Sequence, residues 1–419
     1  MAVPVRAVPP TDLRIDGARL SLRLDELAVR GMQPDGSCAR LALTDEDRAG
    51  RDLVVMWMND LGLDVTVDAI GNVVGTWFVG EGAPVMIGSH IDTVRTGGRY
   101  DGNYGVLSGL EVIETCQRAG YTPSRPLAVA FFTDEEGARF SPDMLGSLVF
   151  AGGLAVEEAH DIIGIDGATV GAELERIGYL GPFPCPATPP HAFVEAHIEQ
   201  GPVLDANGVL IGAVTGVQGI SWQELTIVGQ SNHAGTTPMS YRHDPGYAAS
   251  RIAVFVRQIA RELGGNQVAT VGKIDLHPNL VNVVAGRAVL TVDLRNTDEA
   301  VLQKAEAQLA AFLVELADQE GVTITRKVLA RFEPVTFDDR VVDLVEAHAR
   351  RLGHSVRRMP SGAGHDAQML ARVCPSGMVF VPSLNGISHN PAEHTDAQDL
   401  EHGANVLLGV VLELAEMSL

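Results

Sequence analysis

The chain has 419 residues, of which 46% are hydrophobic and 20% are charged, and its formal net charge is −22 at pH 7. So large an acidic excess argues against a nucleic-acid partner, because phosphate binding requires clustered Lys and Arg. The length favours two domains, and no apolar run is long enough for a membrane helix.

The four cysteines are far apart in the sequence and form no CxxC or CxxxC pair: Cys38, Cys116, Cys185 and Cys374. This spacing indicates neither a cysteine metal site nor a disulfide framework, and it fits reduced cysteines in a cytoplasmic protein. The segment Met1–Leu20 carries charged residues and no apolar core, so we expect that it is not a signal peptide.

Helices and strands alternate in the first part of the chain. We expect an amphipathic helix over Ala18–Arg30 and a second helix after Thr44, whose hydroxyl can cap it. Leu63–Asp68 and Asn72–Phe78 alternate between apolar and polar residues like the strands of a hairpin. Gly181–His191 carries five prolines and is predicted to be a loop.

Three apolar runs end in residues that can bind a metal. The runs Pro84–Ile87, Leu127–Phe132 and Ala192–Ala196 are predicted to be buried strands, with a helix from about residue 103 to 117 between the first two. Open α/β sheets place their sites at the C-terminal ends of the strands. The residues that follow these runs include His90, the pair Glu135-Glu136, and His197. The sequence therefore predicts a metal site at one edge of the sheet.

The pattern changes near Val214. The order strand, helix, strand, strand, helix, strand is expected over Trp222–Val228, Asp244–Leu263, Ala269–Asp275, Ala288–Leu294, Asp298–Gln319 and Val322–Arg331. This order is typical of a split βαβ, or ferredoxin-like, α+β sandwich, and we expect its helices to cover only one face of the sheet.

The α/β pattern returns after Glu333. A helix, a short buried strand and a closing helix are expected over Val341–Leu352, Met378–Val381 and Ala397–Glu416. We therefore expect a discontinuous α/β domain with a mixed sheet, formed by residues 1–213 and 332–419, into which a lid domain of residues 214–331 is inserted.

A hydrolytic site with two metal ions needs oxygen and nitrogen ligands, one carboxylate that bridges the ions, and a free carboxylate that takes a proton from water. Glu135 is next to Glu136, and in extended or turn backbone the two side chains diverge, so that one can hold metal while the other faces the water. A set of His and carboxylate ligands without thiolate suits zinc, manganese, cobalt or nickel. The candidate ligands are His90, Asp101, Glu136, His197 and His389.

Each of these residues also has an ordinary structural interpretation. A single histidine at a strand end is more often a hydrogen-bonded structural residue than a ligand. The pair Glu135-Glu136 can be a solvated surface pair, although Phe131-Phe132 just before it favours an apolar pocket. His365 and Asp366 can cap the helix that follows them or support His389, and we favour support over ligation.

Six motifs stand in the same order as in one known family, between about His90 and Asp396. They are Gly88-Ser89-His90-Ile91-Asp92-Thr93-Val94, Asp101-Gly102-Asn103-Tyr104-Gly105-Val106, Glu135-Glu136, His197-Ile198-Glu199-Gln200-Gly201-Pro202, Asn232-His233-Ala234-Gly235-Thr236-Thr237-Pro238 and Ser388-His389-Asn390. In these motifs the chain resembles the hydantoinase/carbamoylase branch of the M20 family of dinuclear metal amidohydrolases. That branch includes N-carbamoyl-L-amino acid hydrolases, β-ureidopropionases and allantoate amidohydrolases. The resemblance implies a metallohydrolase catalytic domain and an inserted lid that dimerises.

The resemblance also implies roles at the metal centre. Asp101 resembles the bridging ligand, and Glu135 resembles the general base. Asp92 resembles the carboxylate that orients His90. The two histidines His90 and His197 would bind different ions, and so would Glu136 and His389.

Four further residues resemble those that contact substrate. His233 resembles the lid histidine that reaches into the site of the partner subunit and polarises the carbonyl. Gln200, Asn282 and Arg295 resemble substrate-binding residues. Arg295 would grip a carboxylate by a two-pronged bond, although at the end of a strand it can equally form a salt bridge within the lid. Ala285-Gly286 stands where relatives often have Pro-Gly.

Together these observations predict a hydrolase that cleaves the ureido C–N bond of an N-carbamoyl-L-amino acid and releases the amino acid, ammonia and carbon dioxide. We expect two divalent ions per subunit, with zinc favoured, and a homodimer. Allantoate amidohydrolase and β-ureidopropionase are the alternatives within this class, and a peptidase or aminoacylase fits the motifs less well. A non-catalytic binding protein on the same scaffold would be expected to have lost a ligand or the base, and here all five ligands and Glu135 are present.

Overall fold

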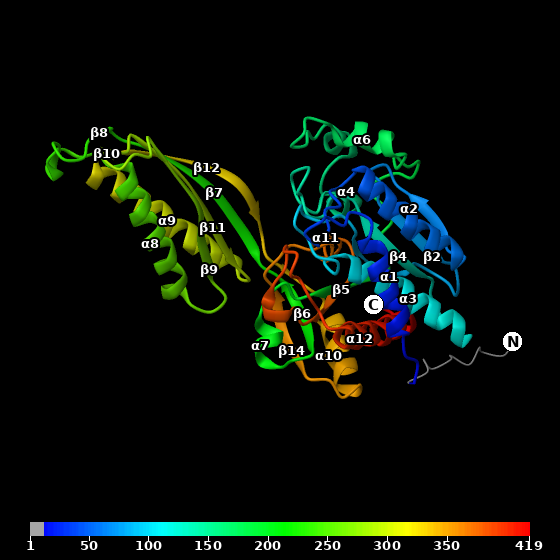
Figure 1. Cartoon of the computed structure of the whole chain (residues 1–419). Helices are drawn as coiled ribbons and strands as arrows, with labels where there is room; N and C mark the ends of the chain where they lie inside the picture. The colour runs from blue at the N-terminus through cyan, green and yellow to red at the C-terminus, as the bar shows by residue number, and fades with distance from the viewer. Residues whose placement is uncertain (1–11) are drawn as a thin grey trace. The chain divides into compact units, whose positions relative to one another are not determined.

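The computed structural model describes residues 12–419, which form two compact units (Figure 1). Unit 1 comprises the described residues up to Gly216 together with Thr336–Leu419, and unit 2 comprises Val217–Val335. The expectation for Met1–Leu20 falls in large part on residues 1–11, which lie outside the described residues. Over residues 12–419, no helix combines the length and the apolar character needed to cross a membrane. All four cysteines are free.

In the described part of the chain, a nine-stranded mixed sheet with strand order β1-β2-β4-β3-β5-β15-β6-β13 forms the centre of unit 1, and β14 pairs with β6. The central strands β4, β3, β5 and β15 are parallel to one another and wholly buried, which confirms the α/β class, and the strands on either side of them, β2 and β6, run antiparallel to β4 and β15. Because parallel strands end at the same edge of a sheet, the residues that follow them meet there. The bounds are β1 Asp64–Val67, β2 Val73–Trp77, β3 Val85–His90, β4 Leu127–Phe132, β5 Ala192–Ile198, β6 Ile211–Val217, β13 Val335–Thr336, β14 Val356–Ser361 and β15 Ser376–Val381.

The longer helices of unit 1 begin and end close to where the sequence predicts them. Thr44 caps α2, since its hydroxyl accepts a hydrogen bond from the Asp47 amide at 3.3 Å. Helix α3 is buried from Asn103 to Cys116 and packs on β3, β4 and β5. The helices are α1 Gly17–Ala28, α2 Asp45–Asp60, α3 Asn103–Ala119, α4 Leu145–Phe150, α5 Val156–His160, α6 Val170–Ile177, α7 Val203–Asn207, α10 Asp339–Arg351, α11 Asp366–Leu370 and α12 Ala397–Glu416, with a 3-10 turn η2 at Leu384–Gly386.

Unit 2 is a four-stranded antiparallel sheet of order β12-β7-β11-β9 with two long helices. Two residues at its tip, β8, pair with β10 in a separate small ladder. The order confirms the predicted ferredoxin-like topology, because the first and third strands lie in the middle. The bounds are β7 Gly219–Val228, β8 Asn232–His233, η1 Met239–Tyr241, α8 Pro245–Leu263, β9 Val268–His277, β10 Val283–Val284, β11 Arg287–Asn296, α9 Glu299–Glu320 and β12 Thr323–Phe332.

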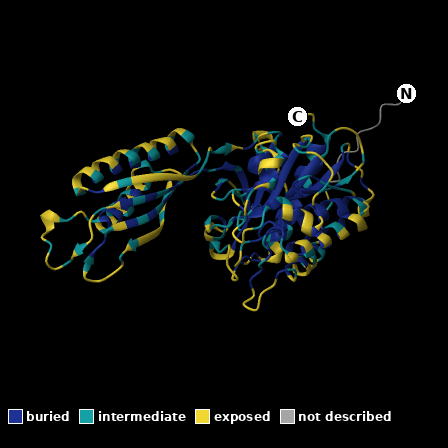
Figure 2. Ribbon diagram, turned by 90° about the horizontal axis from the view of Figure 1, so that it is seen from above, coloured by how far each residue is buried: buried dark blue, intermediate teal, exposed yellow. Residues whose placement is uncertain are grey.

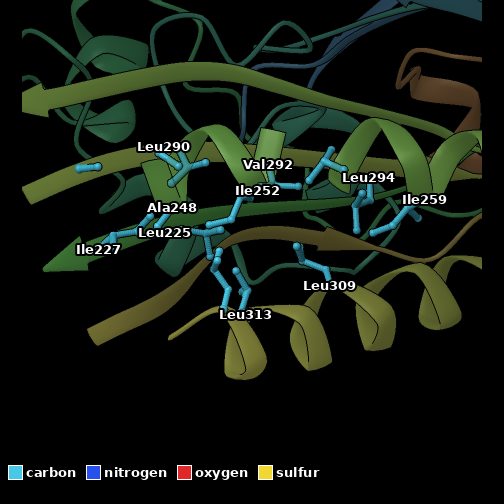
Figure 3. Packing of buried hydrophobic residues seen from close by; sticks show 14 of the residues in the cluster. Leu225, Ile227, Ala248, Ile252, Ile259, Leu290, Val292, Leu294, Leu309 and Leu313 are labelled. Atoms are coloured by element: carbon cyan, nitrogen blue, oxygen red, sulfur yellow. The ribbon is translucent and has the colours of Figure 1, made fainter. Parts of the chain in front are cut away.

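The helices of unit 2 cover one face of its sheet. Buried and half-buried residues alternate along β11, as the period of a strand requires. Figure 2 shows that exposed residues lie along the helices of unit 2 and that buried residues lie among its strands. The buried set packs against α8 and α9 in a core of aliphatic side chains (Figure 3). Figure 3 labels its centre, which includes Leu225, Ile252, Leu290 and Leu309. Unit 2 therefore has a hydrophobic core of its own.

Because the core lies on one face of the sheet, we expect truncations of two neighbouring side chains on β11 to reduce the stability of unit 2 by different amounts. Leu290 is fully buried in the cluster, whereas Val289 points to the other face and is half-buried. We expect Leu290→Ala to destabilise unit 2 by about 2–5 kcal/mol and Val289→Ala to cost much less. Hydrogen exchange of the unit 2 amides in the full chain measures both losses. Equal losses would contradict a core on one face only.

Candidate metal centre

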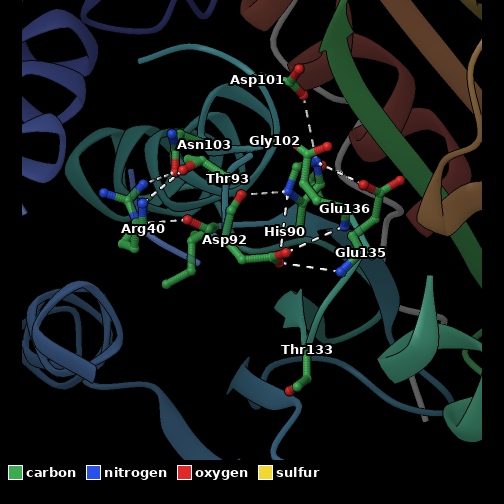
Figure 4. A network of polar contacts seen from close by, with 12 residues as sticks. Arg40, His90, Asp92, Thr93, Asp101, Gly102, Asn103, Thr133, Glu135 and Glu136 are labelled. Atoms are coloured by element: carbon green, nitrogen blue, oxygen red, sulfur yellow. Dashed lines mark hydrogen bonds and ion pairs between the residues drawn. The ribbon is translucent and has the colours of Figure 1, made fainter. Parts of the chain in front are cut away.

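Four neighbouring buried strands bring the predicted ligands to one edge of the sheet of unit 1 (Figure 4). His90 is the last residue of β3, and His197 lies near the end of β5. Glu136 follows β4 in a turn where Asp134 and Gly137 have positive φ. Asp101 precedes α3, and His389 lies in the loop between η2 and α12.

The carboxylate of Asp101 lies between three histidine rings. Its Oδ1 is 3.1 Å from Nε2 of His197 and 3.6 Å from Nε2 of His90. Its Oδ2 is 3.3 Å from Nε2 of His389, whose ring is also 3.2 Å from Oε2 of Glu136. Asp101 therefore contacts both halves of the cluster, as a bridging carboxylate must.

The ligand atoms form two overlapping groups, each within 4.8 Å: His90, Asp101 and His197 in one, and Asp101, Glu136 and His389 in the other. This grouping puts His90 together with His197, and Glu136 together with His389, whereas the sequence-based expectation assigned the members of each pair to different ions. The physical reason is the sheet. Strands β3 and β5 are direct neighbours, so the histidines at their ends share one position.

The donor set fits divalent metal ions. Nδ1 of His90 is 3.0 Å from the Asp92 carbonyl oxygen, and Nδ1 of His197 is 2.8 Å from the Ile198 carbonyl oxygen. A carbonyl oxygen only accepts, so each Nδ1 carries a proton and each Nε2 directs its lone pair, or a second proton, toward the Asp101 carboxylate. A cation between these groups satisfies all of them. Oε1 of Glu136 is buried and has no hydrogen-bond partner within residues 12–419, so it is a further atom that can bind metal.

Gly102 lets the Asp101 loop approach His90 closely. Its φ is +66°, and a Cβ at this position would overlap the imidazole of His90. The absence of a side chain there keeps the ring of His90 facing the carboxylate (Figure 4).

The electrostatics of the cluster resist protonation of Asp101 and favour protonated histidines. Burial opposes the charged form of Asp101, but hydrogen bonds from three histidines hold its pKa well below the usual range. Hydrogen bonds to Asp101 and Glu136 raise the pKa of His389 to about 10. Burial alone would lower the pKa of His90, yet Glu135 and Asp101 raise it well above its ordinary value. In the metal-free protein, protons thus occupy the positions that metal ions would take.

Glu135 lies beside this cluster without belonging to either ligand group. Its Oε2 is 3.4 Å from Nε2 of His90, and its side chain diverges from that of Glu136, which faces His389. Burial, with the charges of Asp366 and Glu136 in addition, raises the pKa of Glu135 well above the ordinary value of a glutamic acid. A carboxyl with a raised pKa binds a proton more readily than an ordinary glutamate does, which suits a group that takes up and returns a proton.

Asp92 acts differently from the expectation. Nδ1 of His90 donates to the main-chain carbonyl oxygen of Asp92, while the nearest carboxylate oxygen of Asp92 is 3.9 Å from that nitrogen. The two carboxylate oxygens instead accept the amides of Glu135 and Glu136, at 3.2 and 3.3 Å. Asp92 therefore links the His90 strand end to the Glu135-Glu136 turn (Figure 4). Burial raises the pKa of Asp92 to about 6.

Gln200 also lies at the cluster. Its backbone has a φ of +57°, and its Nε2 donates to Oδ2 of Asp101 at 2.7 Å. Its Oε1 is buried and has no hydrogen-bond partner among the described residues. This amide oxygen is available to a molecule bound beside the metal ligands.

The three other predicted site residues belong to unit 2. His233 pairs with Val283 in the small ladder, and the Asn282 carbonyl accepts the Ala234 amide at 2.9 Å, so His233 and Asn282 lie side by side. Arg295 donates to both carboxylate oxygens of Asp293 at 3.1 Å, and its guanidinium lies 5.6 Å from the ring centre of Trp222. The salt bridge within the lid that its strand position allows is therefore present.

His365 supports a different ligand from the one expected. Its ring packs edge-on against His197 with centroids 4.6 Å apart, and its Nε2 is 2.8 Å from the Ser361 hydroxyl. It occupies the N-cap position of α11 without a side-chain cap. His365 therefore contacts His197 and not His389, which differs from the expectation. The reason is that its ring also packs on Phe380 of β15, and Phe380 lies opposite His197 of the neighbouring strand β5.

Sequence reasoning missed two buried carboxylates around the cluster. Glu195 accepts the Ser89 hydroxyl at 2.6 Å and the Ala367 amide at 2.8 Å, and an acidic residue inside an apolar strand was the available signal. Glu393 accepts the Tyr100 and Asp101 amides at 3.1 and 3.3 Å. No pattern in the sequence marks Glu393, since its partners are almost 300 positions away.

The raised histidine pKa values predict that metal binding is coupled to proton release. His389 has a pKa of about 10 in the metal-free protein, so at neutral pH an incoming ion must displace its proton. The apparent affinity should therefore rise with pH and continue to rise until His389 is deprotonated. Calorimetric titration of zinc into metal-depleted protein, in two buffers of different ionisation enthalpy, measures the protons released. A pH-independent affinity without proton release would contradict this arrangement.

Comparisons with known proteins agree with this cluster. The model of peptidase family M20/M25/M40 matches residues 86–413. An N-carbamoyl-L-amino-acid amidohydrolase of Rhizobium meliloti is 41% identical over 417 residues, covering 98% of this chain and 99% of that protein. The allantoate amidohydrolase of Escherichia coli strain K12 is 37% identical over 395 residues, covering 93% of this chain and 96% of that protein. The crystal structure of an amidase of the hydantoinase/carbamoylase family from Burkholderia multivorans has a TM-score of 0.93 at 45% identity, covering 97% of this chain and 100% of that chain. The chain belongs to peptidase family M20/M25/M40 and, within it, to the hydantoinase/carbamoylase branch.

Proposed function

We propose that this hydrolase cleaves the ureido C–N bond of an N-carbamoyl-L-amino acid and releases the amino acid, ammonia and carbon dioxide. The observation that carries the proposal is the Asp101 carboxylate between three histidine nitrogens, with the free carboxyl of Glu135 beside them. The full-length similarity to an N-carbamoyl-L-amino-acid amidohydrolase supports the choice of substrate. The reduced cysteines fit a cytoplasmic enzyme.

We infer that two divalent ions, most simply zinc, are held by His90, Asp101 and His197 and by Asp101, Glu136 and His389. Bound there, such ions lower the pKa of a water molecule and polarise a carbonyl group. The set contains imidazole and carboxylate but no thiolate, which also suits manganese, cobalt or nickel.

Glu135 is the proposed general base. It lies within 3.4 Å of a ligand nitrogen but outside both ligand groups, so its carboxylate is free to take the proton of the attacking water. The same carboxyl then returns that proton to the nitrogen that leaves. Asp92 positions Glu135 by accepting its main-chain amide at 3.2 Å.

His233 is the proposed donor to the ureido oxygen. Its Nδ1 accepts the amides of Gly235 and Thr236 at 3.0 and 3.2 Å. An accepting Nδ1 leaves the proton of a neutral imidazole on Nε2, and an Nε2–H donates to an oxyanion. The adjacent Asn282 would add an amide to the same end of the substrate.

Arg295 and Gln200 are the proposed contacts for the remaining polar groups of the substrate. A carboxylate that joins Asp293 at the guanidinium of Arg295 would form charge-assisted hydrogen bonds. The stacking of Arg295 on Trp222 and its pairing with Asp293 hold the guanidinium in one orientation before substrate arrives. The partnerless Oε1 of Gln200 is available to a ureido N–H.

Allantoate is the second candidate substrate, since an allantoate amidohydrolase is 37% identical over 395 residues. Both candidates carry a ureido group and a carboxylate, so the same residues would hold them, and N-carbamoyl-β-alanine remains a third. Ammonia release from N-carbamoyl-L- and D-amino acids, N-carbamoyl-β-alanine, allantoate and ureidoglycolate decides among them. The highest kcat/KM on allantoate would overturn the choice of an N-carbamoyl-L-amino acid.

The base assignment predicts that Glu135→Gln retains metal and loses turnover. The amide keeps the shape of the side chain but cannot take a proton, so kcat should fall by about 10²-fold or more. Elemental analysis and ammonia release measure the two effects, and Glu158→Gln, an exposed carboxyl on α5, is the matched control. Near-normal turnover in a metal-replete Glu135→Gln protein would rule out this role.

We further propose a homodimer in which His233 of each chain completes the site of the other, as twofold assembly allows. In that case a mixture of His233→Ala and Glu135→Gln chains forms heterodimers with both defects in one site and an intact second site. Activity should return to as much as half that of wild type per heterodimer, while each homodimer stays nearly inactive. Sedimentation measures the assembly. Mixing that restores nothing, or an active monomer, would contradict the exchange.

A further inference from the structure

We infer that Glu393 is a positioning residue that clamps the loop of Asp101 to the loop of His389, and thereby sets how tightly the ion held by Asp101, Glu136 and His389 is bound. This inference rests on the metal centre proposed above. None of the motifs that carry the family resemblance includes Glu393.

The carboxylate of Glu393 bridges two segments of the chain. One oxygen, Oε1, accepts the amides of Tyr100 and Asp101 at 3.1 and 3.3 Å. The other, Oε2, is 3.0 Å from the hydroxyl of Ser388, the residue before His389. Glu393 is only 6% exposed, so water does not replace these partners.

Ser388 extends this contact to the side chain of the bridging ligand. Its Oγ is 3.1 Å from Oδ2 of Asp101 as well as 3.0 Å from Oε2 of Glu393. Glu393 thus contacts the Asp101 loop through the main-chain amide of Asp101 and contacts Ser388 through its hydroxyl, whose single proton can be donated to either Glu393 or Asp101. Oδ2 is the oxygen of Asp101 that faces His389. These contacts therefore affect the group of Asp101, Glu136 and His389 more than the group of His90, Asp101 and His197.

His389 needs such support more than the other ligands do. Its side chain is 48% exposed, whereas those of His90 and His197 are 1% exposed, so little packing holds its ring. Its φ is +55°, a left-handed conformation that is unfavourable for a residue with a Cβ and that surrounding contacts must therefore impose. The loop is held on both sides of His389, by the Thr96 hydroxyl on its carbonyl oxygen at 3.0 Å and by Glu393.

Gly98 leaves the space that the Glu393 side chain occupies. A Cβ on Gly98 would overlap Oε1, Cδ and Cβ of Glu393, and the φ of Gly98 is not in the left-handed region. The methyl group of an alanine at position 98 would therefore collide with the Glu393 side chain, but it would not strain the backbone. This gives a second way to displace the carboxylate without removing it.

The test is titration of metal-depleted protein with cobalt, whose visible absorption reports the ligands of each ion. Removing a residue that holds metal ligands in place typically weakens metal affinity by about 10–100-fold. We expect a loss of this size for the ion held by Asp101, Glu136 and His389 in Glu393→Ala and in Gly98→Ala, with a changed spectrum for that ion and little effect on the other. In Glu393→Gln the amide oxygen can still accept the loop amides, so affinity should return toward that of wild type.

Asp68→Ala is the matched control. Asp68 is likewise a buried carboxylate that accepts two backbone amides, those of Ile70 and Asn72 at 3.0 and 2.9 Å, and it contacts none of the five ligands. We expect this variant to lose thermal stability with unchanged cobalt affinities. Wild-type affinity for both ions in Glu393→Ala, or an equal loss in Asp68→Ala, would overturn the role of Glu393. If Glu393→Ala does not fold, Gly98→Ala decides in the same way.

The two proposals fail in different ways. Wild-type protein that binds fewer than two cobalt ions per chain would overturn the metal centre, and the role of Glu393 with it. Wild-type protein that binds two ions, with no weakening in Glu393→Ala or Gly98→Ala, would leave the metal centre standing and remove only the clamp.

Discussion

The site depends on one electrostatic constraint, the burial of the Asp101 carboxylate among three imidazoles. Three Nε2 atoms lie within 3.6 Å of its two oxygens. A buried carboxylate is costly unless cations or donors surround it, and here either protons or metal ions meet that need. In the metal-free protein this constraint raises the pKa values of His90 and His389 and lowers the pKa of Asp101.

The loops around this carboxylate are held by main-chain contacts more than by ligand-to-ligand bonds. The buried guanidinium of Arg40 donates to the Ile91 carbonyl at 2.6 Å and to Oδ1 of Asn103 at 2.7 Å, which fastens the segments that follow His90 and Asp101 (Figure 4). Asp92 fastens the Glu135-Glu136 turn, and Glu393 fastens the Asp101 loop. These contacts from residues outside the ligand set add to those between the ligands and hold the ligand-bearing segments in place.

Unit 2 has a hydrophobic core of its own, which supports the polar residues at its tip. This core lies between one face of the sheet and two helices, and His233 and Asn232 in the small ladder at the tip are not part of it. His233 is exposed, and its Nδ1 is already bonded to two amides. The backbone around it therefore sets its tautomer before any substrate arrives.

The sequence by itself determined the class of fold, the order of the long elements and the residue types of the centre, because apolar periodicity, caps and strand ends are local properties. It missed the short helices α4, α5, α6 and α7 and the strands β6, β8, β10, β13 and β14, whose patterns are too brief to separate from loops. Only the tertiary structure decided that His90 shares a group with His197, and that the main-chain carbonyl of Asp92, not its carboxylate, fixes the ring of His90. It alone revealed Glu393, which meets the Asp101 amide across 292 positions. Such pairings follow from which strands lie side by side and how their loops close, and no local pattern in the chain encodes that.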